Sequence, residues 1–472
     1  MISDLKPYPS YKDSGAPWLG QVPEHWRVRR GKWLFRHKKI LNLNRSNENV
    51  LSLTLRGVVN NNPENPEGLV PKDYATYQLF EKGDLVFKLI DLENLRTSRV
   101  GLVHEDGIMS SAYVRLVQHN AGDIRFFFHQ YFDLYQRGVY NQLGAGVRST
   151  ISPDDLLNMA VSIPPLPEQS AIVRFLDHAN RKIRRYIRAK QKLIKLLEEQ
   201  KQAIIHRAVT RGLDPKVRLK SSGVEWLGDM PEYWKISALR HRYSQCLGKM
   251  LDSKRISGKH LLPYLRNTDV QWDRIKVGDL PTMDILPHEQ DRYCLEEGDL
   301  LVCEGGEVGR SALWSGQLTV CGFQKALHRL RPLKRERDVP RYLYYALHAA
   351  AKAGAFDDGH QSTIAHLTGD KLRAHSFAFP PSDEQESIIN FLDFALGKIN
   401  LTVTAARRKI ALLHELRTRL IADVVTGKLD IREAAAKLPD ESPEPEPEPN
   451  PEPSFSENGA EEAEPAPEEI EA

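Results

Sequence analysis

Glycine–lysine pairs are the first pattern in this sequence that could do chemistry, because a phosphate-binding loop needs Gly-Lys followed by Ser or Thr. Five such pairs occur, at Gly31-Lys32, Gly248-Lys249, Gly258-Lys259, Gly397-Lys398 and Gly427-Lys428. The residues that follow these pairs are Trp, Met, His, Ile and Leu. None of the five pairs therefore predicts an NTPase site.

Other catalytic patterns are equally incomplete. Pro153-Asp154 with Glu199-Gln200-Lys201 resembles a carboxylate-plus-lysine nuclease pattern, but the second group lies within a long predicted helix, where solvated helix charges explain it better. The Pro-Pro pairs stand before long helices and do not belong to the Asn/Asp-Pro-Pro-Tyr/Phe motif of a base methylase. The histidines are scattered without an H-E-x-x-H motif, so the sequence predicts no metal site.

The four cysteines, Cys246, Cys294, Cys303 and Cys321, form no C-x-x-C pair. Cys294 and Cys303 are expected to fill a strand face and not to bind zinc. The sequence has no signal-peptide pattern and no apolar run near the ~18 residues of a membrane span, which favours a cytoplasmic, reduced protein. We expect no catalytic residue, no metal and no cofactor in this chain.

The charge of the chain is unevenly distributed. The formal net charge is +3, yet residues 440–472 contain thirteen Asp and Glu and no Lys or Arg. Without this segment, 66 basic residues stand against 50 acidic ones (63 − 13), so the rest of the chain carries +16. Such a body favours a polyanionic partner. The Pro/Glu-rich tail is predicted to be disordered, because it contains too little apolar surface to form a core.

The elements that would position any binding residues come from an internal repeat. Residues 14–26, which contain Trp18-Leu19-Gly20, recur as residues 222–234 with an offset of 208. Residues 164–177, which begin with Pro164-Pro165, recur as residues 380–393 with an offset of 216, and this register continues to Asp214 and Asp430. The segments between these repeats differ in sequence and length. The chain is therefore predicted to contain two copies of one unit.

The repeated segment after each Pro-Pro pair predicts a long helix. No Pro or Gly interrupts residues 168–210, and apolar residues follow a coiled-coil spacing of four and three. The first copy supplies Ile172, Leu176, Ala179, Ile183, Tyr186, Leu193, Leu197 and Ile204, and the second Ile388, Leu392, Ala395, Ile399, Leu413, Leu416 and Leu420. Burying both stripes favours two antiparallel helices of about 60 Å each. The chain would then return toward its own beginning, with approximate two-fold symmetry.

These motifs resemble one known family, the specificity subunits of type I restriction-modification enzymes. The Trp-Leu-Gly-x-x-Pro-x-x-Trp motif, the Pro-Pro-x-x-Glu-Gln-x-x-Ile-x-x-Phe-Leu-Asp helix start and the Gly-Asp-Leu turns all occur twice, in the same order. The resemblance implies a non-catalytic subunit with two target-recognition domains, each of which reads one half of a split, asymmetric DNA site. It also implies helices that dock two methyltransferase subunits, with restriction subunits completing an ATP-dependent endonuclease.

The resulting prediction is a mixed α/β fold of two globular domains, joined by two long antiparallel coiled-coil helices in a pseudo-two-fold arrangement and followed by a disordered acidic tail. The two target-recognition domains are assigned to residues 1–163 and 215–379. The long helices are assigned to residues 164–214 and 380–432, and the tail to residues 439–472.

Loops that follow short strands are the predicted DNA-reading elements. Arg and Lys can reach guanine acceptors, Gln can pair with adenine, and Ser or Thr suits bases or phosphates. In the first domain the candidates are Lys88, Arg96, Arg99, Arg148, Ser149 and Thr150; in the second they are Arg310, Lys325, Gln361, Ser362 and Thr363. An ordinary surface or phosphate-binding role is the alternative for each. Because Ser-Thr-Ile occurs in both domains, it suits a shared structural or phosphate-binding task.

The first long helix is rich in basic residues that could contact spacer phosphates, and a solvated helix face is the equally weighted alternative. These residues are Arg174, Arg181, Lys182, Arg184, Arg185, Arg188, Lys190, Lys192 and Lys195. Two other functions stay open from the sequence. The chain could be a stand-alone DNA-bridging protein, or a single-chain enzyme with an unrecognised motif.

Overall fold

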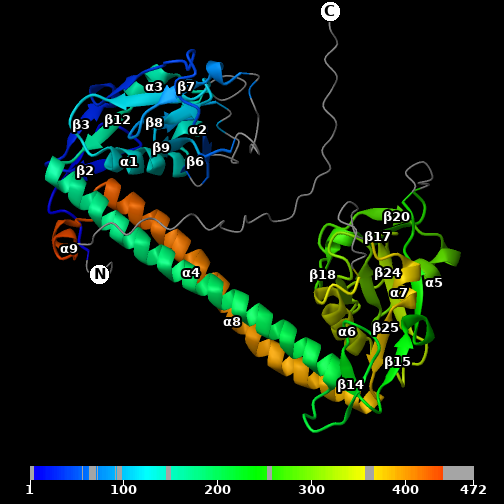
Figure 1. Cartoon of the computed structure of the whole chain (residues 1–472). Coiled ribbons are helices and arrows are strands. Elements are labelled where there is room, and N and C mark those ends of the chain that lie inside the picture. The colour runs from blue at the N-terminus through cyan, green and yellow to red at the C-terminus, as the bar shows by residue number, and fades with distance from the viewer. Residues whose placement is uncertain are drawn as a thin grey trace, which may run out of the picture. The chain divides into compact units, whose positions relative to one another are not determined.

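The computed structural model divides the chain into two compact units, which are described separately (Figure 1). The first unit combines Met1–Lys182 with Leu416–Ala472, and the second is Ile183–Glu415. Each unit thus contains one domain and parts of both long helices. The structure describes residues 5–55, 57–62, 71, 73–90, 92, 98–144, 150–251, 258–356 and 366–439.

The first unit is built on an antiparallel four-stranded sheet. Its strands, in spatial order, are β4 (Phe35–His37), β11 (Val114–Gln118), β8 (Leu85–Phe87) and β9 (Val100–Leu102). Four two-stranded pairs surround it: β1 (Tyr11–Asp13) with β2 (Gln21–Pro23), β3 (Arg27–Arg30) with β12 (Ala160–Ile163), β5 (Leu51–Thr54) with β6 (Gly57–Asn60), and β7 (Gln78–Phe80) with β10 (Gly107–Met109). The helices of this domain are α1 (Ile124–Gln136), α2 (Val139–Leu143) and α3 (Pro153–Asn158), with the short 3-10 turns η1 (Gly31–Trp33) and η2 (Tyr74–Thr76).

Aromatic side chains join α1 to this sheet. Tyr131 of α1 lies edge-on to Phe87 of β8, with ring centroids 5.2 Å apart, and Phe127 makes the same contact with Phe35 of β4 at 5.6 Å. All four side chains are buried in one cluster that also receives Trp26. Burial of such rings supplies much of the hydrophobic stabilisation of a domain of this size.

The second unit repeats this design with additional strands. Its main antiparallel sheet has the order β16 (Tyr243–Leu247), β24 (Leu327–Pro332), β21 (Leu300–Cys303) and β22 (Ser311–Leu313). A second sheet contains β20 (Thr282–Asp284), β17 (Leu261–Leu265) and β23 (Gly322–Phe323), and the remaining pairs are β13 (Leu219–Ser221) with β14 (Asp229–Pro231), β15 (Lys235–Ala238) with β25 (Ser376–Phe379), and β18 (Val270–Gln271) with β19 (Arg274–Ile275). Its helices are α5 (Gln290–Tyr293), α6 (Pro340–Lys352) and α7 (Gly369–Ala374), with the 3-10 turns η3 (Leu239–His241), η5 (Asn267–Asp269) and η6 (Pro287–Glu289). The mixed α/β prediction is therefore confirmed for both domains.

The two long helices are α4 (Leu166–Arg211) and α8 (Ser382–Val425). In the first unit, Ile172 and Leu176 of α4 share a buried cluster with Leu420 and Val424 of α8. In the second unit, Ile183 and Ile187 of α4 cluster with Ile410 of α8, and Lys201 Nζ donates to Asn400 Oδ1 at 3.1 Å. As the residue numbers of α4 increase, those of its contacts on α8 decrease. The pairing is therefore antiparallel within each unit, as predicted.

The predicted seam of the helices is wrong in its middle. Tyr186 and Leu193 are exposed, whereas Ile187 is buried in the position that the heptad pattern gave to Tyr186. In α8, Leu396 is buried in place of the predicted Ala395, and Val403, seven residues later, is buried as well. A straight helix of 3.6 residues per turn drifts against a strict 3.5-residue repeat, which moves the contact by one residue.

By length and composition alone, α8 could also cross a membrane, because one 18-residue window has a mean hydropathy of 1.2. The apolar side chains of Ile388, Leu392 and Ile399, however, are buried in the hydrophobic core of the second unit. The composition of α8 is therefore explained in part by packing.

The end of each long helix returns to a Trp-Leu-Gly motif. Gly427, at φ +76°, stands where an added Cβ would lie 2.4 Å from Pro23 and 3.1 Å from Trp26. Gly212 has φ +71°, and a Cβ added to it would lie 3.2 Å from the Trp234 side chain. Asp430 N then donates to Lys6 O at 2.8 Å, ahead of α9 (Arg432–Ala436). The predicted return of Asp430 to the N-terminal motif is confirmed, while the acidic tail lies outside the described residues after Pro439.

Candidate nucleic-acid interface

Near the start of each long helix, a glutamate binds the last tryptophan of a Trp-Leu-Gly-x-x-Pro-x-x-Trp motif. In the first unit, Trp26 Nε1 donates to Glu168 Oε1 at 2.9 Å, Tyr8 donates its hydroxyl at 2.6 Å, and His25 Nε2 lies 2.7 Å from Oε2. Burial and the hydrogen bond to Glu168 raise the pKa of Tyr8 far above its usual value, so its hydroxyl keeps its proton. The carboxylate of Glu168 thus joins three segments of the chain.

The second unit repeats this contact with fewer donors. Trp234 Nε1 donates to Glu384 Oε2 at 3.1 Å, and the Tyr233 hydroxyl donates to Oε1 at 3.0 Å. Tyr233 takes the place of His25 in the 208-residue offset. Glu168 and Glu384 also lie in the first turn of their helices, where a negative charge is favourable. The repeated Trp and Glu, present in both copies, were the signal that could have revealed this contact.

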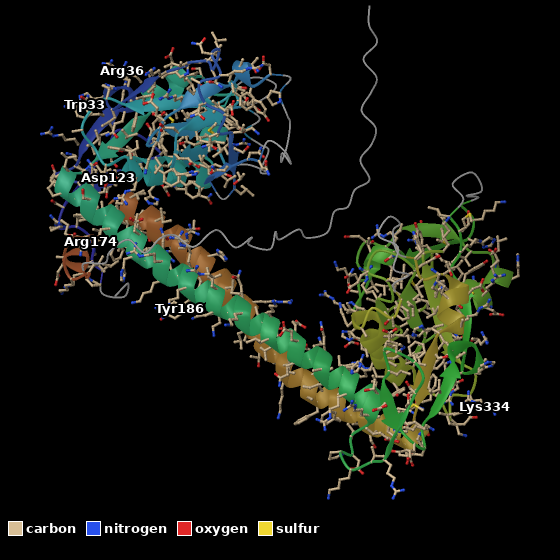
Figure 2. The ribbon with its side chains drawn as sticks, in the orientation of Figure 1. Trp33, Arg36, Asp123, Arg174, Tyr186 and Lys334 are labelled. Atoms are coloured by element: carbon tan, nitrogen blue, oxygen red, sulfur yellow. The ribbon has the colours of Figure 1, made fainter. Side chains whose placement is uncertain are left out.

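The glutamine after each glutamate holds the start of a domain helix. Gln169 Oε1 accepts from the backbone N–H of Asp123, the N-cap residue of α1, at 2.8 Å (Figure 2). Gln385 Oε1 accepts from the N–H of Val339, the N-cap residue of α6, at 3.0 Å. In both copies the glutamine amide also donates to the carbonyl of the first proline of the Pro-Pro pair, Pro164 or Pro380. A buried donor at a helix start is thereby satisfied.

An ion pair completes the attachment just over two helical turns later. Arg125 of α1 lies 2.9 Å from Asp177 of α4, and Arg341 of α6 lies 2.9 Å from Asp393 of α8. We call these repeated contacts of glutamate, glutamine and aspartate the helix clamp; its members are Glu168, Gln169 and Asp177 in the first unit and Glu384, Gln385 and Asp393 in the second. The clamp thus attaches the start of each long helix to its own domain by several repeated contacts.

The Gly-Asp-Leu turns are also matched in structure. Gly83 and Gly298 adopt φ values of +94° and +90°, which favour glycine. Asp84 accepts from Glu81 N and lies 2.6 Å from the wholly buried guanidinium of Arg115. Burial raises the pKa of the Asp84 carboxyl, against the lowering effects of the Glu81 N–H and Arg115.

The second Gly-Asp-Leu turn also contains a buried aspartate, but its arginine partner comes from a different position on the neighbouring strand. Asp299 accepts from Glu296 N at 2.7 Å and lies 2.5 Å from Arg331. Arg115 precedes the β11 residue that pairs with Leu85, whereas Arg331 follows the β24 residue that pairs with Leu300. The two arginines therefore come from positions two residues apart on the same strand face.

Three of the predicted reading residues meet beside β8. Lys88 N donates to Arg99 O at 3.0 Å. Ile151 N donates to Leu89 O at 3.1 Å, which places the exposed Thr150 near the same end of β8. Arg99 itself is wholly buried, which favours a structural role in this conformation. No comparison or contact tests DNA binding by Lys88, Arg99 or Thr150, so these assignments stay predictions.

In the second domain, the two candidates that the structure describes contact different residues. Arg310 Nη2 donates to the backbone oxygen and the side-chain Oδ1 of Asn267, at 2.9 and 2.7 Å. Lys325 is exposed, and its N–H donates to Lys249 O at 3.0 Å. Both stay predictions. The other candidates lie outside the described residues and also stay predictions: Arg96, Arg148, Ser149, Gln361, Ser362 and Thr363.

Sequence reasoning missed a basic surface in the first unit, between β3 and the segment after β4. Trp33 is 44% exposed, and it lies with Arg36 at the surface of the unit (Figure 2). Burial and the charge of Arg36 lower the pKa of His119. We call this surface the β3–β4 basic patch; its cationic residues, all exposed, are Arg27, Arg29, Arg30, Lys32, Arg36, Lys38 and Lys39. Residues 27–39 contain seven Lys and Arg and no Asp or Glu, and this run of charge could have revealed the patch from the sequence.

The cysteines behave largely as expected. Cys303 lies in β21, and its burial raises its pKa to about 11, which disfavours a thiolate. Cys294 is only partly buried and lies outside the named strands, but it forms an isolated β-bridge with Gly322 of β23 and packs against the cluster around Tyr264, which agrees with a place beside a strand. Within the described part of the chain, no group of three His, Cys, Asp or Glu side chains is placed to hold a metal ion.

The comparisons with known proteins agree with this arrangement. The family model of the type I restriction modification DNA specificity domain matches twice, over residues 25–196 and 248–410. A chain named as the MjaX type I restriction enzyme specificity subunit of Methanocaldococcus jannaschii is 19% identical over 438 residues, which cover 88% of this chain and 96% of that one.

One solved structure supports the same fold, and a second is reported beside it. One chain, from work on complex assembly and conformational transition of the type I R-M system, has a TM-score of 0.64 at 17% identity, over 86% of this chain and 99% of that chain. The HsdS subunit from Thermoanaerobacter tengcongensis has a TM-score of 0.47 at 18% identity, over 86% and 98%. Because the family model covers most of the chain in two copies, this protein belongs to the type I restriction-modification specificity subunits, whose role is DNA recognition and not catalysis.

Proposed function

We propose that this chain reads a split, asymmetric DNA target, with one half recognised by the domain of each unit. The observation that carries the proposal is the repeated helix clamp, which joins two different domains to long helices in the same way. Domains that share their attachment but differ in their loops are suited to reading different half-sites. The long helices would then set the number of base pairs between them.

Exchange of one domain tests this proposal. Residues 27–163 would be replaced by the corresponding segment of another specificity subunit, and the methylated sequence would be determined in a host that expresses the complete complex. We expect one half of the target to change and the other half and the spacing to remain. A matched exchange of residues 235–379 should change the other half only. A change of both halves by either exchange would exclude modular recognition.

The β3–β4 basic patch is proposed to contact phosphates and not bases. Its seven cations lie on one short segment, and none of them forms an ion pair with the described residues. In the triple variant R36Q/K38Q/K39Q, affinity should fall by a similar factor for all DNA sequences, and the slope of log K against log salt should lessen by about 2–3. The control is K437Q, at the exposed lysine that follows α9 and pairs with Glu433. A changed target sequence in the triple variant would contradict a phosphate role.

The long helices are proposed to dock two methyltransferase subunits, and restriction subunits would complete a cytoplasmic assembly in which this chain itself holds no cofactor. Exposed apolar side chains of the helices support a docking role, because such residues mark interaction sites when they cluster. In the second unit these include Tyr186, Leu196, Leu401 and Leu412, which are 57%, 52%, 74% and 50% exposed.

Co-purification tests this docking and the alternative of a stand-alone DNA-bridging protein. The full chain should retain two methyltransferase chains through size-exclusion chromatography, and L401K/L412K should retain fewer. L333K, at a residue that is 55% exposed away from the helices, is the control. Methylation or cleavage by this chain alone would refute a specificity role that depends on partners.

A further inference from the structure

One face of α4 carries four cations at helical spacing. Arg185, Arg188, Lys192 and Lys195 are all exposed, and steps of three, four and three residues place them on one side of the helix. The seam residues Ile183 and Ile187 occupy the opposite side, against α8. We call these four residues the α4 basic face.

Charge repulsion makes this face costly for an isolated helix. Like charges at i,i+3 and i,i+4 destabilise a helix, and residues 178–197 contain eight Lys and Arg without any Asp or Glu. None of the four cations of the face has an ion-pair or hydrogen-bond partner among the described residues. A polyanion that binds along the helix would relieve this repulsion.

The chain supplies such a polyanion itself. Residues 440–472 contain thirteen carboxylates and no cation, and glutamate occupies every second position from Glu444 to Glu448. These 33 residues could span at most about 100 Å in an extended polyproline conformation. Their charge and length suit the α4 basic face.

The point where the tail begins is fixed on the same helix. Arg174 of α4 donates from Nη2 to the carbonyls of Leu438 and Pro439, at 2.8 and 3.1 Å (Figure 2). Arg185 follows Arg174 by eleven residues in the sequence of the same helix. Because the tail is joined covalently to the chain, its effective concentration near the face is on the order of millimolar.

We propose that the acidic tail, residues 440–472, docks on the α4 basic face of its own chain and competes there with DNA phosphates. The docking depends only on the tail and the face. The competition rests on the proposed function, because it assumes that DNA approaches this helix. The tail would then weaken binding to non-specific DNA, whereas base contacts elsewhere would let the target displace it.

Zero-length cross-linking of the full chain tests the docking without DNA. A carbodiimide joins carboxylates to lysines that touch them, and mass spectrometry locates the products. We expect cross-links from tail glutamates to Lys192 and Lys195, reduced several-fold at about 1 M salt, where the screening length is about 3 Å. R185Q/R188Q should reduce them as well, although both lysines remain. Equal cross-linking to Lys334, an exposed lysine of the second unit, or none at the face, would overturn the proposal.

Binding of non-specific duplex DNA tests the competition. A chain that ends at Pro439 should bind such DNA on the order of tenfold more tightly than the full chain at low salt, and less so at high salt. This gain should be lost in R185Q/R188Q. The full chain with its tail glutamates changed to glutamine is the matched control for length, and it should behave as the truncated chain. Unchanged DNA affinity together with the expected cross-links would refute competition and leave the docking established.

Discussion

The two units keep the same helix clamp but surround it differently. Glu168 receives hydrogen bonds from two buried donors and lies beside His25, whereas Glu384 is bound by Trp234 and by Tyr233, which is 53% exposed. The contacts to the domain helix through Gln169 and Gln385 are nearly identical. The junction of domain and helix is therefore preserved in both units, while the surroundings of each junction differ.

Removal of the tryptophan that binds the clamp glutamate should have the largest effect. W26A and W234A each remove a wholly buried indole together with its hydrogen bond, and each should lower the unfolding free energy of its own unit by about 3–5 kcal/mol. Hydrogen exchange measured separately for residues of the two units will show where protection is lost. Equal loss in both units from either variant would mean that the clamps are not independent.

Loss of the turn aspartate should distinguish the two units. D84N leaves the guanidinium of Arg115, which is wholly buried, with only the more exposed Glu81 as an anionic partner, so a loss of about 3 kcal/mol is expected. D299N should cost about half as much, because the Arg331 side chain is 20% exposed and retains Glu296. Chemical denaturation monitored by exchange within each unit provides the measurement. A larger loss for D299N would contradict this reasoning from burial.

Neutralisation of the clamp glutamate should have a smaller, unequal effect. E168Q weakens the hydrogen bonds from Tyr8 and Trp26, and about 2 kcal/mol should be lost from the first unit. E384Q should cost about 1 kcal/mol, since its tyrosine partner can turn to water. The midpoints of thermal unfolding of the two variants give the ranking, with E386Q, at an exposed neighbour, as the control. Identical shifts would show that the extra donors of the first unit add nothing.

The ion pair of the clamp should matter least. Asp177 and Arg125 are both more than one third exposed, so D177N should change stability by less than about 1 kcal/mol, and the effect should decrease further with salt. Comparison of unfolding at low and high salt measures it. A loss of stability as large as that of E168Q would mean that the Arg125–Asp177 ion pair also positions the helix.

The sequence predicted the repeat, the mixed fold and both long helices, because exact spacing survives in the motifs even where the domains diverge. It did not predict the partners of Glu168 and Gln169, since a hydrogen bond between residues 142 positions apart leaves no local pattern. The seam was displaced at Tyr186 because a heptad template ignores the drift of a straight helix. The reading loops were the least predictable part, because base contacts depend on how loops dock on DNA.

The turn aspartates also bear on how such domains can change. Asp84 takes its guanidinium from Arg115 and Asp299 takes its own from Arg331, which occupies a different register on the neighbouring strand. An intermediate with arginine at both positions would keep the carboxylate neutralised throughout such a replacement, and the second unit carries Arg329 and Arg331 together. Along such a route the arginine changes its position on the strand while the buried aspartate keeps a cationic partner at every step.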